Sequence, residues 1–240
     1  MYFLLSGEGP TDIGTCADGS LACGGTAFLH GPMSAIVDRL VERKHHYSIL
    51  DFEACGFISE GGLAQRAAEL KSVKKSARLP GKKRGKETRY YFNNARVMAR
   101  IAREREEQRK EPVVAVLFRD SDWTASAGRG LWNEKRESIL DGFEEERFER
   151  GVPMVPKPKS EAWLLCALRR PRYANCDALE DESGNDRSPN SLKKQLAPHI
   201  GERPVRETLV HMVVNGIVDV DRINMPSFRE FRQRLEDVIE

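Results

Sequence analysis

The sequence has few features of a secreted or membrane protein. Its five cysteines form no CxxC pair and no regular framework, which favours a reducing compartment. No apolar run approaches the ~18 residues of a membrane span, and no basic segment precedes the first apolar residues as it does in a secretory signal. We therefore expect a soluble cytoplasmic protein with no membrane partner.

Net charge and internal repetition are also nearly absent. The 39 basic and 37 acidic residues almost cancel, so the formal net charge of +2 indicates no class of partner. No internal repeat is visible. A chain of 240 residues can bury a full core as one α/β domain, or as one domain with a small appendage. The informative charge is local rather than global.

A strong local excess of positive charge lies at residues 71–89. Nine Lys and Arg side chains stand there with a single acid, Glu87, and three aromatic residues follow at 90–92. Such a field most commonly binds phosphate backbones, and the tyrosines could stack on bases, although the segment could equally be a solvated loop. We expect it to contact nucleic acid, DNA ahead of RNA. The expected contact residues are Lys74, Lys75, Arg78, Lys82, Lys83, Arg84, Lys86 and Arg89.

The sequence VVAVLFRDSDWT, at 113–124, predicts the central strand of a sheet. Its first six residues are apolar on both strand faces, which indicates a strand covered by helices on both sides, as in parallel sheets. Ligands of such sheets bind beyond the carboxyl ends of the strands. Asp120 and Asp122 lie at that end and are candidates for an acidic, metal-binding edge.

Acidic residues also follow two other predicted strands. The first strand, 1–6, ends in the loop GEGPTD, which carries Glu8 and Asp12 and continues to Gly31. A short strand at 152–155 is followed by the rigid loop PKPK, with Ser160 as N-cap and Glu161 in the first turn of a helix. The ordinary explanations are two solvated acids in a polar turn and a Glu that favours the helix dipole.

The remaining pattern is mostly helical. A helix at 32–44 and a strand at 47–57 complete a strand-helix-strand unit after the first strand. Further helices are expected from Asn93 or Asn94 to about 110, at 133–150, around 191–196 and at 205–215. The last, 227–240, begins with a capping box of Ser227 and Glu230. We predict an α/β, Rossmann-like fold with a mostly parallel sheet flanked by helices and a helical C-terminal extension.

Convergence of these acids in one crevice would require a cation. Carboxylates at ~4 Å repel strongly when ionised, and sites of oxygen ligands alone select Mg²⁺ or Mn²⁺ over zinc. The expected metal ligands are Glu8, Asp12, Asp120, Asp122 and Glu161. Cys16, Cys23 and His30 could be imagined as a zinc set, but their spacing fits no common zinc finger.

At these residues the sequence resembles the Toprim family, with Glu8 in SGEGPTD after the first strand and Asp120 and Asp122 in LFRDSD after a later one. It is closest to the Toprim part of OLD-family nucleases, whose additional acids match Asp12 and Glu161. The EAWLL run is also similar to small stand-alone Toprim-like proteins of unknown function. The resemblance covers about residues 1–170, a catalytic domain with a basic insert at about 66–92; residues 171–240 would pack on it as an extension. The long interval before Asp120 and the absence of an SGGK motif depart from the family.

The resemblance implies metal-dependent cleavage of phosphodiester bonds. The five acids would hold one or two divalent ions, with Glu8 alternatively acting as general base, and Lys157 or Lys159 would offset charge on the phosphate. We take Lys159 with Glu8, Asp120, Asp122 and Glu161 as the catalytic set. Nucleases of this type often work with an ATPase, and this sequence has no P-loop GxxxxGK[ST]. An ATPase partner in a phage-defence or repair system is therefore expected by analogy, and homo-oligomer formation is left open.

Two other functions compete with the nuclease. DSDWT fits the DxDxT motif of haloacid-dehalogenase-like phosphatases, in which Asp120 would be the nucleophile and Asp122 the acid/base. That motif normally lies near the start of the chain and requires a later acidic pair, which is not evident. The second alternative is a non-catalytic nucleic-acid-binding or regulatory subunit, in which the basic segment binds and the carboxylates only cap turns.

Overall fold

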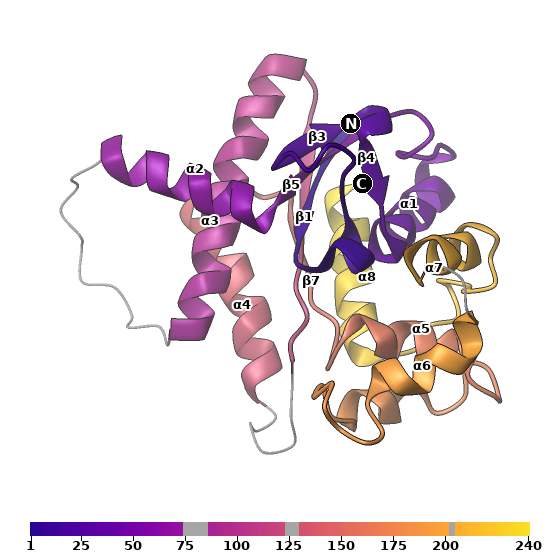
Figure 1. Cartoon of the computed structure of the whole chain (residues 1–240). Coiled ribbons are helices and arrows are strands. Elements are labelled where there is room, and N and C mark those ends of the chain that lie inside the picture. The colour runs from indigo at the N-terminus through magenta and orange to yellow at the C-terminus, as the bar shows by residue number, and fades with distance from the viewer. Residues whose placement is uncertain (74–85, 123–129, 202–204) are drawn as a thin grey trace.

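A five-stranded, mostly parallel sheet runs through the centre of the protein (Figure 1). The computed structural model describes residues 1–73, 86–122, 130–201 and 205–240. The strand order is β3-β5-β1-β6-β7, with β3 antiparallel to its neighbour and the other four strands parallel. The bounds are β1 (Tyr2–Gly7), β3 (Ala22–Gly24), β5 (Cys55–Ser59), β6 (Val113–Phe118) and β7 (Gly151–Met154). Numbered along the chain, the parallel strands have the order 2-1-3-4, so the winding direction reverses between β1 and β6.

Helices cover both faces of this sheet, as the sequence predicted (Figure 1). One face carries α2 (Glu60–Val73), α3 (Lys86–Arg109) and α4 (Gly130–Glu145). The other side carries α1 (Pro32–His45), α5 (Ser160–Leu168), α6 (Leu192–Ile200), α7 (Val205–Val214) and α8 (Pro226–Val238). Across the described ranges, none of these helices combines the length and apolar character needed to cross a bilayer.

The strands divide their side chains between two cores. In β1, Phe3 and Leu5 pack with the helices on the α1 side, whereas Leu4 packs with α3 and α4. In β6, Val116 and Leu117 divide in the same way, and every residue of this strand is buried. The double coverage explains why the sequence of β6 is apolar at consecutive positions instead of alternating.

The helical C-terminal region shares the core on the α1 side. Trp163 of α5 is fully buried between Phe228 and Phe231 of α8, with ring centroids 5.0 and 5.6 Å away. Its indole Nε1–H donates to Ser227 Oγ at 2.8 Å, and the Ser227 backbone N–H donates to Glu180 at 2.7 Å. The predicted capping box is therefore wrong. The helix α8 begins at Pro226, and Ser227 connects it to Trp163 of α5 and to Glu180.

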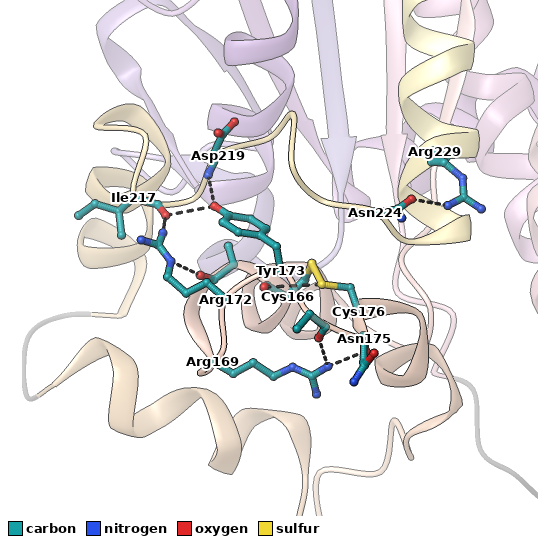
Figure 2. Close-up of a disulfide and its surroundings, with 12 residues drawn as sticks. Cys166, Arg169, Arg172, Tyr173, Asn175, Cys176, Ile217, Asp219, Asn224 and Arg229 are labelled. Atoms are coloured by element: carbon teal, nitrogen blue, oxygen red, sulfur yellow. Dashed lines mark hydrogen bonds between the residues drawn. A yellow bond between two sulfur atoms is a disulfide. The ribbon is translucent and has the colours of Figure 1, made fainter.

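Four of the five cysteines form disulfides, which their spacing did not predict. Cys166 and Cys176 join the end of α5 to the short 3₁₀ helix η4 (Cys176–Asp181), next to the arginine and tyrosine contacts that order this loop (Figure 2). A second bond joins Cys16 to Cys23. Cys55 is free, and burial raises the pKa of its thiol to about 12. Cytoplasmic location stays a prediction.

The expected loop between residues 7 and 31 contains more structure than the sequence indicated. A π-helical turn, η1 (Gly9–Ile13), leads into β2 (Gly14–Cys16), and a short 3₁₀ turn, η2 (Gly25–Ala27), precedes β4 (Phe28–His30); β2 and β4 form a small antiparallel sheet. Gly14 has a φ of 123°, and a Cβ there would lie 2.6 Å from the Leu29 carbonyl oxygen. The glycines that suggested an irregular loop therefore permit close strand approach.

Several predicted element boundaries are wrong. Residues 47–54 form turns, and β5 begins only at Cys55, because Asp38 of α1 accepts hydrogen bonds from Ser48 Oγ at 2.9 Å and Leu50 N at 3.1 Å. The helix expected from Asn93 or Asn94 begins at Lys86, because its first turns pack on α4. The helix expected at 133–150 is α4, which ends at Glu145 before the turn that leads to β7.

Candidate functional site

The predicted acids meet at the carboxyl ends of β1 and β6, where the winding of the sheet reverses. Loops on either side of such a reversal leave a crevice in which doubly wound folds bind ligands. Glu8 directly follows β1, Asp120 and Asp122 follow β6, and α5 begins six residues after β7. We call the five acids at this edge the carboxylate rim: Glu8, Asp12, Asp120, Asp122 and Glu161.

The backbone after β6 is held against the segment after β7. Arg119 N donates to Met154 O at 3.0 Å, Ser121 N to Pro156 O at 3.2 Å, and Asp122 N to Pro158 O at 3.0 Å. These bonds continue the pairing of β6 and β7 beyond the sheet. They bring the DSD segment to the first turn of α5. The sequence predicted only that both lie at the same edge of the sheet.

Asp120 lies at the centre of the carboxylate rim. Its backbone N–H donates to Glu8 Oε1 at 2.8 Å, and its side-chain Oδ1 accepts from Ser160 N at 2.9 Å. Burial raises the pKa of Asp120 well above its usual value, and the nearby charges of Asp12, Glu161 and Glu8 raise it further. The Asp120 carboxylate is therefore the group that a nearby cation would stabilise most.

Ser160 connects three of the acids. Its backbone N–H binds Asp120, and its hydroxyl donates to Asp12 Oδ1 at 2.6 Å and lies 3.4 Å from Glu161 Oε2. The predicted N-cap role of Ser160 is wrong, because Lys159 is the N-cap residue and makes no side-chain cap bond. The Ser160 hydroxyl instead holds an acid 148 residues earlier in the chain.

Glu8, Asp12 and Glu161, which are half-buried, also resist ionisation. Burial raises the pKa of Glu8, and the Arg119 charge only partly offsets this effect. Burial raises the pKa of Asp12 against its hydrogen bonds from Ser160 and Thr11, and burial and the Asp12 charge raise that of Glu161. Four carboxyl groups with raised pKa values therefore share one rim. Solvated acids in polar turns would keep ordinary pKa values, so that explanation does not account for these residues.

The two candidate lysines differ in their contacts. Lys159 Nζ lies 3.3 Å from Asp122 Oδ1 and 3.0 Å from Asp186 Oδ1. Burial lowers the pKa of Lys159, but the hydrogen bond to Asp186 and the charges of Asp122 and Asp120 hold it above its usual value. Lys157 instead lies 4.0 Å from Glu180 and 3.9 Å from Asp181. Of these two lysines, Lys159 is the one that contacts the carboxylate rim.

Arg119 lies beside the carboxylate rim, and the sequence prediction did not include it in the site. Its side chain is 1% exposed, and its Nη1 donates to Glu60 Oε2 at 3.0 Å and to Glu8 Oε2 at 3.4 Å. The guanidinium lies 5.0 Å from the centre of the Tyr90 ring. The sequence did contain a signal, because Arg119 stands directly between an apolar strand and a DxD pair. A buried positive charge at such a position needs anionic partners nearby.

Most of the predicted nucleic-acid contact residues lie outside the described residues: Lys74, Lys75, Arg78, Lys82, Lys83 and Arg84. Lys86 begins α3, and Arg89 is exposed on the same helix. Tyr90 is 38% exposed, whereas Tyr91 is buried and donates to the Asp120 carbonyl oxygen at 2.9 Å. Tyr91 is therefore a structural neighbour of the carboxylate rim, and Tyr90 is the exposed aromatic ring beside it.

The carboxylate rim has suitable donors for a hard cation but not a preformed set of ligands. Over the described ranges, no group of three or more His, Cys, Asp or Glu side chains is arranged to hold a metal ion. Asp122 points outward, with a side chain that is 59% exposed. The donor chemistry, acids whose charges oppose one another, fits Mg²⁺ or Mn²⁺, and binding would require the side chains to converge.

A separate cavity of about 750 Å³ lies away from the carboxylate rim. Its lining includes His30, Asp38, Cys55, Arg206 and His211, and the rim acids are not among the described residues around it. Asp38 is already hydrogen-bonded to Ser48 and to the Leu50 backbone. Its other acids, Glu42, Asp51, Glu53 and Glu207, share the lining with the basic residues Arg39 and Arg206.

Comparisons with protein-family models, curated proteins and solved structures give no match. The likeness to Toprim proteins therefore depends on the short motifs at Glu8, Asp12, Asp120, Asp122 and Glu161 alone.

Proposed function

We propose that the protein is a divalent-cation-dependent nuclease with a Toprim-like catalytic domain that cleaves phosphodiester bonds of DNA or RNA. The observation that carries this proposal is the position of Asp120 at the winding reversal, with its pKa raised by burial and further by the charges of Asp12, Glu161 and Glu8. Buried acids that repel one another reduce stability and need a reason to persist. Cation binding supplies that reason.

Mg²⁺ or Mn²⁺, when bound, would supply Lewis-acid stabilisation of the phosphate and lower the pKa of an attacking water. Asp120 and Asp122, with Asp12 and Glu161, would hold the cation. Glu8 would accept a proton, because its raised pKa makes its carboxylate a stronger base than an exposed Glu. Lys159, already beside Asp122, would offset charge on the phosphate.

Nucleic acid would reach the rim from the basic segment. The last residues of this segment begin α3, and Tyr90 of that helix has its ring 5.0 Å from the Arg119 guanidinium. Backbone contacts by the segment would give affinity without sequence preference. By analogy with OLD-family nucleases, an ATPase partner is part of this proposal, and full activity of the isolated chain would count against such a partner.

The deciding experiment compares cleavage of supercoiled plasmid by the wild type and Asp120→Asn, with Mg²⁺ or Mn²⁺ and with EDTA. We expect cation-dependent cleavage by the wild type, none by Asp120→Asn, and equal DNA binding by both. Asp38→Asn is the matched control, because Asp38 is another buried acid whose pKa burial raises, but it lies outside the carboxylate rim.

Other outcomes of the same experiment identify the competing functions. DNA binding without cleavage by either protein, with or without the cation, would favour the non-catalytic binding subunit. Release of phosphate from small phosphomonoesters, with a phosphoaspartate trapped on Asp120, would favour the phosphatase. Either result would refute the proposal that the protein is a nuclease.

A further inference from the structure

The guanidinium of Arg119 has unused hydrogen-bonding capacity at the carboxylate rim. Only its Nη1 is engaged, with Glu60 and Glu8. Its Nε and Nη2 are buried and have no hydrogen-bond partner among the described residues. Buried donors of a charged group are costly to leave unpaired, so this edge of Arg119 calls for an acceptor.

The chain itself shows what this edge of an arginine binds. In Arg100, Nε donates to Glu146 Oε2 at 2.8 Å and Nη2 donates to Glu146 Oε1 at 2.7 Å. Nε and Nη2 point the same way from the planar guanidinium, so together they match two oxygens of one carboxylate or phosphate. At Arg119 both neighbouring acids lie on Nη1, and the edge that can bind two oxygens is left to a ligand.

We propose that the Nε–Nη2 edge of Arg119 is a phosphate-binding fork at the carboxylate rim. This proposal rests on the proposed function, from which it takes phosphate as the anion. Glu8 and Glu60 hold the guanidinium through Nη1, and the Tyr90 ring lies 5.0 Å from it. Arg119 thereby supplies the second cation, besides Lys159, that a phosphate between acids requires.

Binding at this fork depends on a divalent cation. In the free protein, Glu8 lies against Arg119, and the charges of Asp12, Glu161 and Glu8 act on the adjacent Asp120, so these acids repel an incoming phosphate once ionised. Mg²⁺ at the carboxylate rim would reverse that local field. Phosphate and Mg²⁺ therefore increase each other's affinity by the same factor, as linkage requires.

The direct test is NMR of the arginine Nε–H groups in the wild-type protein, titrated with inorganic phosphate in the presence of Mg²⁺. Arg119→Lys and Arg100→Lys assign the two resonances by removing them. We expect a saturable shift of the Arg119 resonance with phosphate, a much smaller shift with acetate, and none at Arg100. No shift at Arg119, or equal shifts at both arginines, overturns the fork, and a larger shift with acetate overturns phosphate as its ligand.

Variants connect the fork to substrate binding. Arg119→Lys keeps the charge but removes the two-oxygen edge; we expect about a tenfold weaker binding of a labelled DNA oligonucleotide with Ca²⁺ and a raised KM, with Arg100→Lys unchanged. Thermal melting checks the fold of both variants. Phosphate binding at Arg119 without any cleavage by the wild type would overturn the nuclease and keep the fork. Cleavage with unchanged KM and unchanged oligonucleotide affinity in Arg119→Lys would overturn the fork alone.

Discussion

Replacing Asp120 with Asn removes one charge from the carboxylate rim while keeping the size and shape of the side chain. Asp120 is surrounded by Asp12, Glu161 and Glu8, whose charges raise its pKa in addition to the effect of burial. Its side chain accepts one backbone hydrogen bond, from Ser160 N at 2.9 Å, which an Asn carbonyl oxygen could also accept. The variant should therefore be more stable than the wild type when no divalent cation is present.

The magnitude follows from comparing these two effects. At ~6 Å and an effective dielectric constant of ~20, two unit charges repel by about 3 kcal/mol. Making the Ser160 hydrogen bond neutral costs about 1 kcal/mol. Even with a single ionised neighbour, the net gain in unfolding free energy is about 2 kcal/mol. For a chain of this size that corresponds to a rise in Tm of roughly 4–8 °C.

The pH dependence of stability shows at which pH the Asp120→Asn variant should be the more stable protein. Because the pKa of Asp120 is raised in the folded state, the folded protein keeps this proton to a higher pH than the unfolded chain. The wild type therefore loses stability as the pH rises from the ordinary Asp value of about 3.9 through the raised pKa. The advantage of Asp120→Asn should grow as the pH rises through the raised pKa and should vanish below about pH 4.

Thermal melting by circular dichroism, with EDTA and with Mn²⁺, measures both effects. Mn²⁺ should raise the Tm of the wild type more than that of Asp120→Asn, because the variant has lost a ligand. The control Asp38→Asn should gain less, because burial is the main cause of its raised pKa and the hydrogen bonds from Ser48 and Leu50 partly offset it. A Tm for Asp120→Asn at about pH 8 that is below the wild-type value would refute the repulsion on which the cation site depends.

Three further predictions test other parts of the protein. Replacing Cys166 and Cys176 with Ser should lower the free energy of unfolding in urea by about 3 kcal/mol, because the bond closes a ten-residue separation; no change would mean that the bond is not formed. Neutralising residues 82–84 should weaken DNA binding and reduce its salt slope by up to about 3, and a salt-independent affinity would exclude this segment. Trp163→Ala should cost about 3–5 kcal/mol in the same urea assay, and a loss below ~1 kcal/mol would show that α8 is not anchored there.

The sheet and its helices could be predicted because hydrophobic pattern alone specifies them. Consecutive apolar residues at 113–118 predicted a strand covered on both faces, and β6 is buried along its whole length. The rule that ligands bind at carboxyl ends then placed Glu8 and Asp120 on one edge, where the structure links them by a hydrogen bond of 2.8 Å. Local pattern and topology are sufficient for that much.

The details that failed depend on contacts between distant parts of the chain. Ser160 reads locally as an N-cap, but its hydroxyl binds Asp12. Residues 47–52 read as a strand, but Asp38 holds Ser48 and Leu50 in a turn. The disulfide partners are adjacent only because of the surrounding fold, with Cα atoms 5.8 and 5.0 Å apart. Periodicity contains no information about such pairings.

Both margins of the sheet are protected against addition of another strand. On one side, the short antiparallel β3 covers β5 and is tied down through the Cys16–Cys23 bond. On the other, Arg234 of α8 binds the carbonyl oxygens of Gly151, at 3.0 Å, and Glu149 beside β7. A second copy of this chain therefore cannot pair with β5, or with β7 at Gly151, without displacing β3 or the Arg234 side chain.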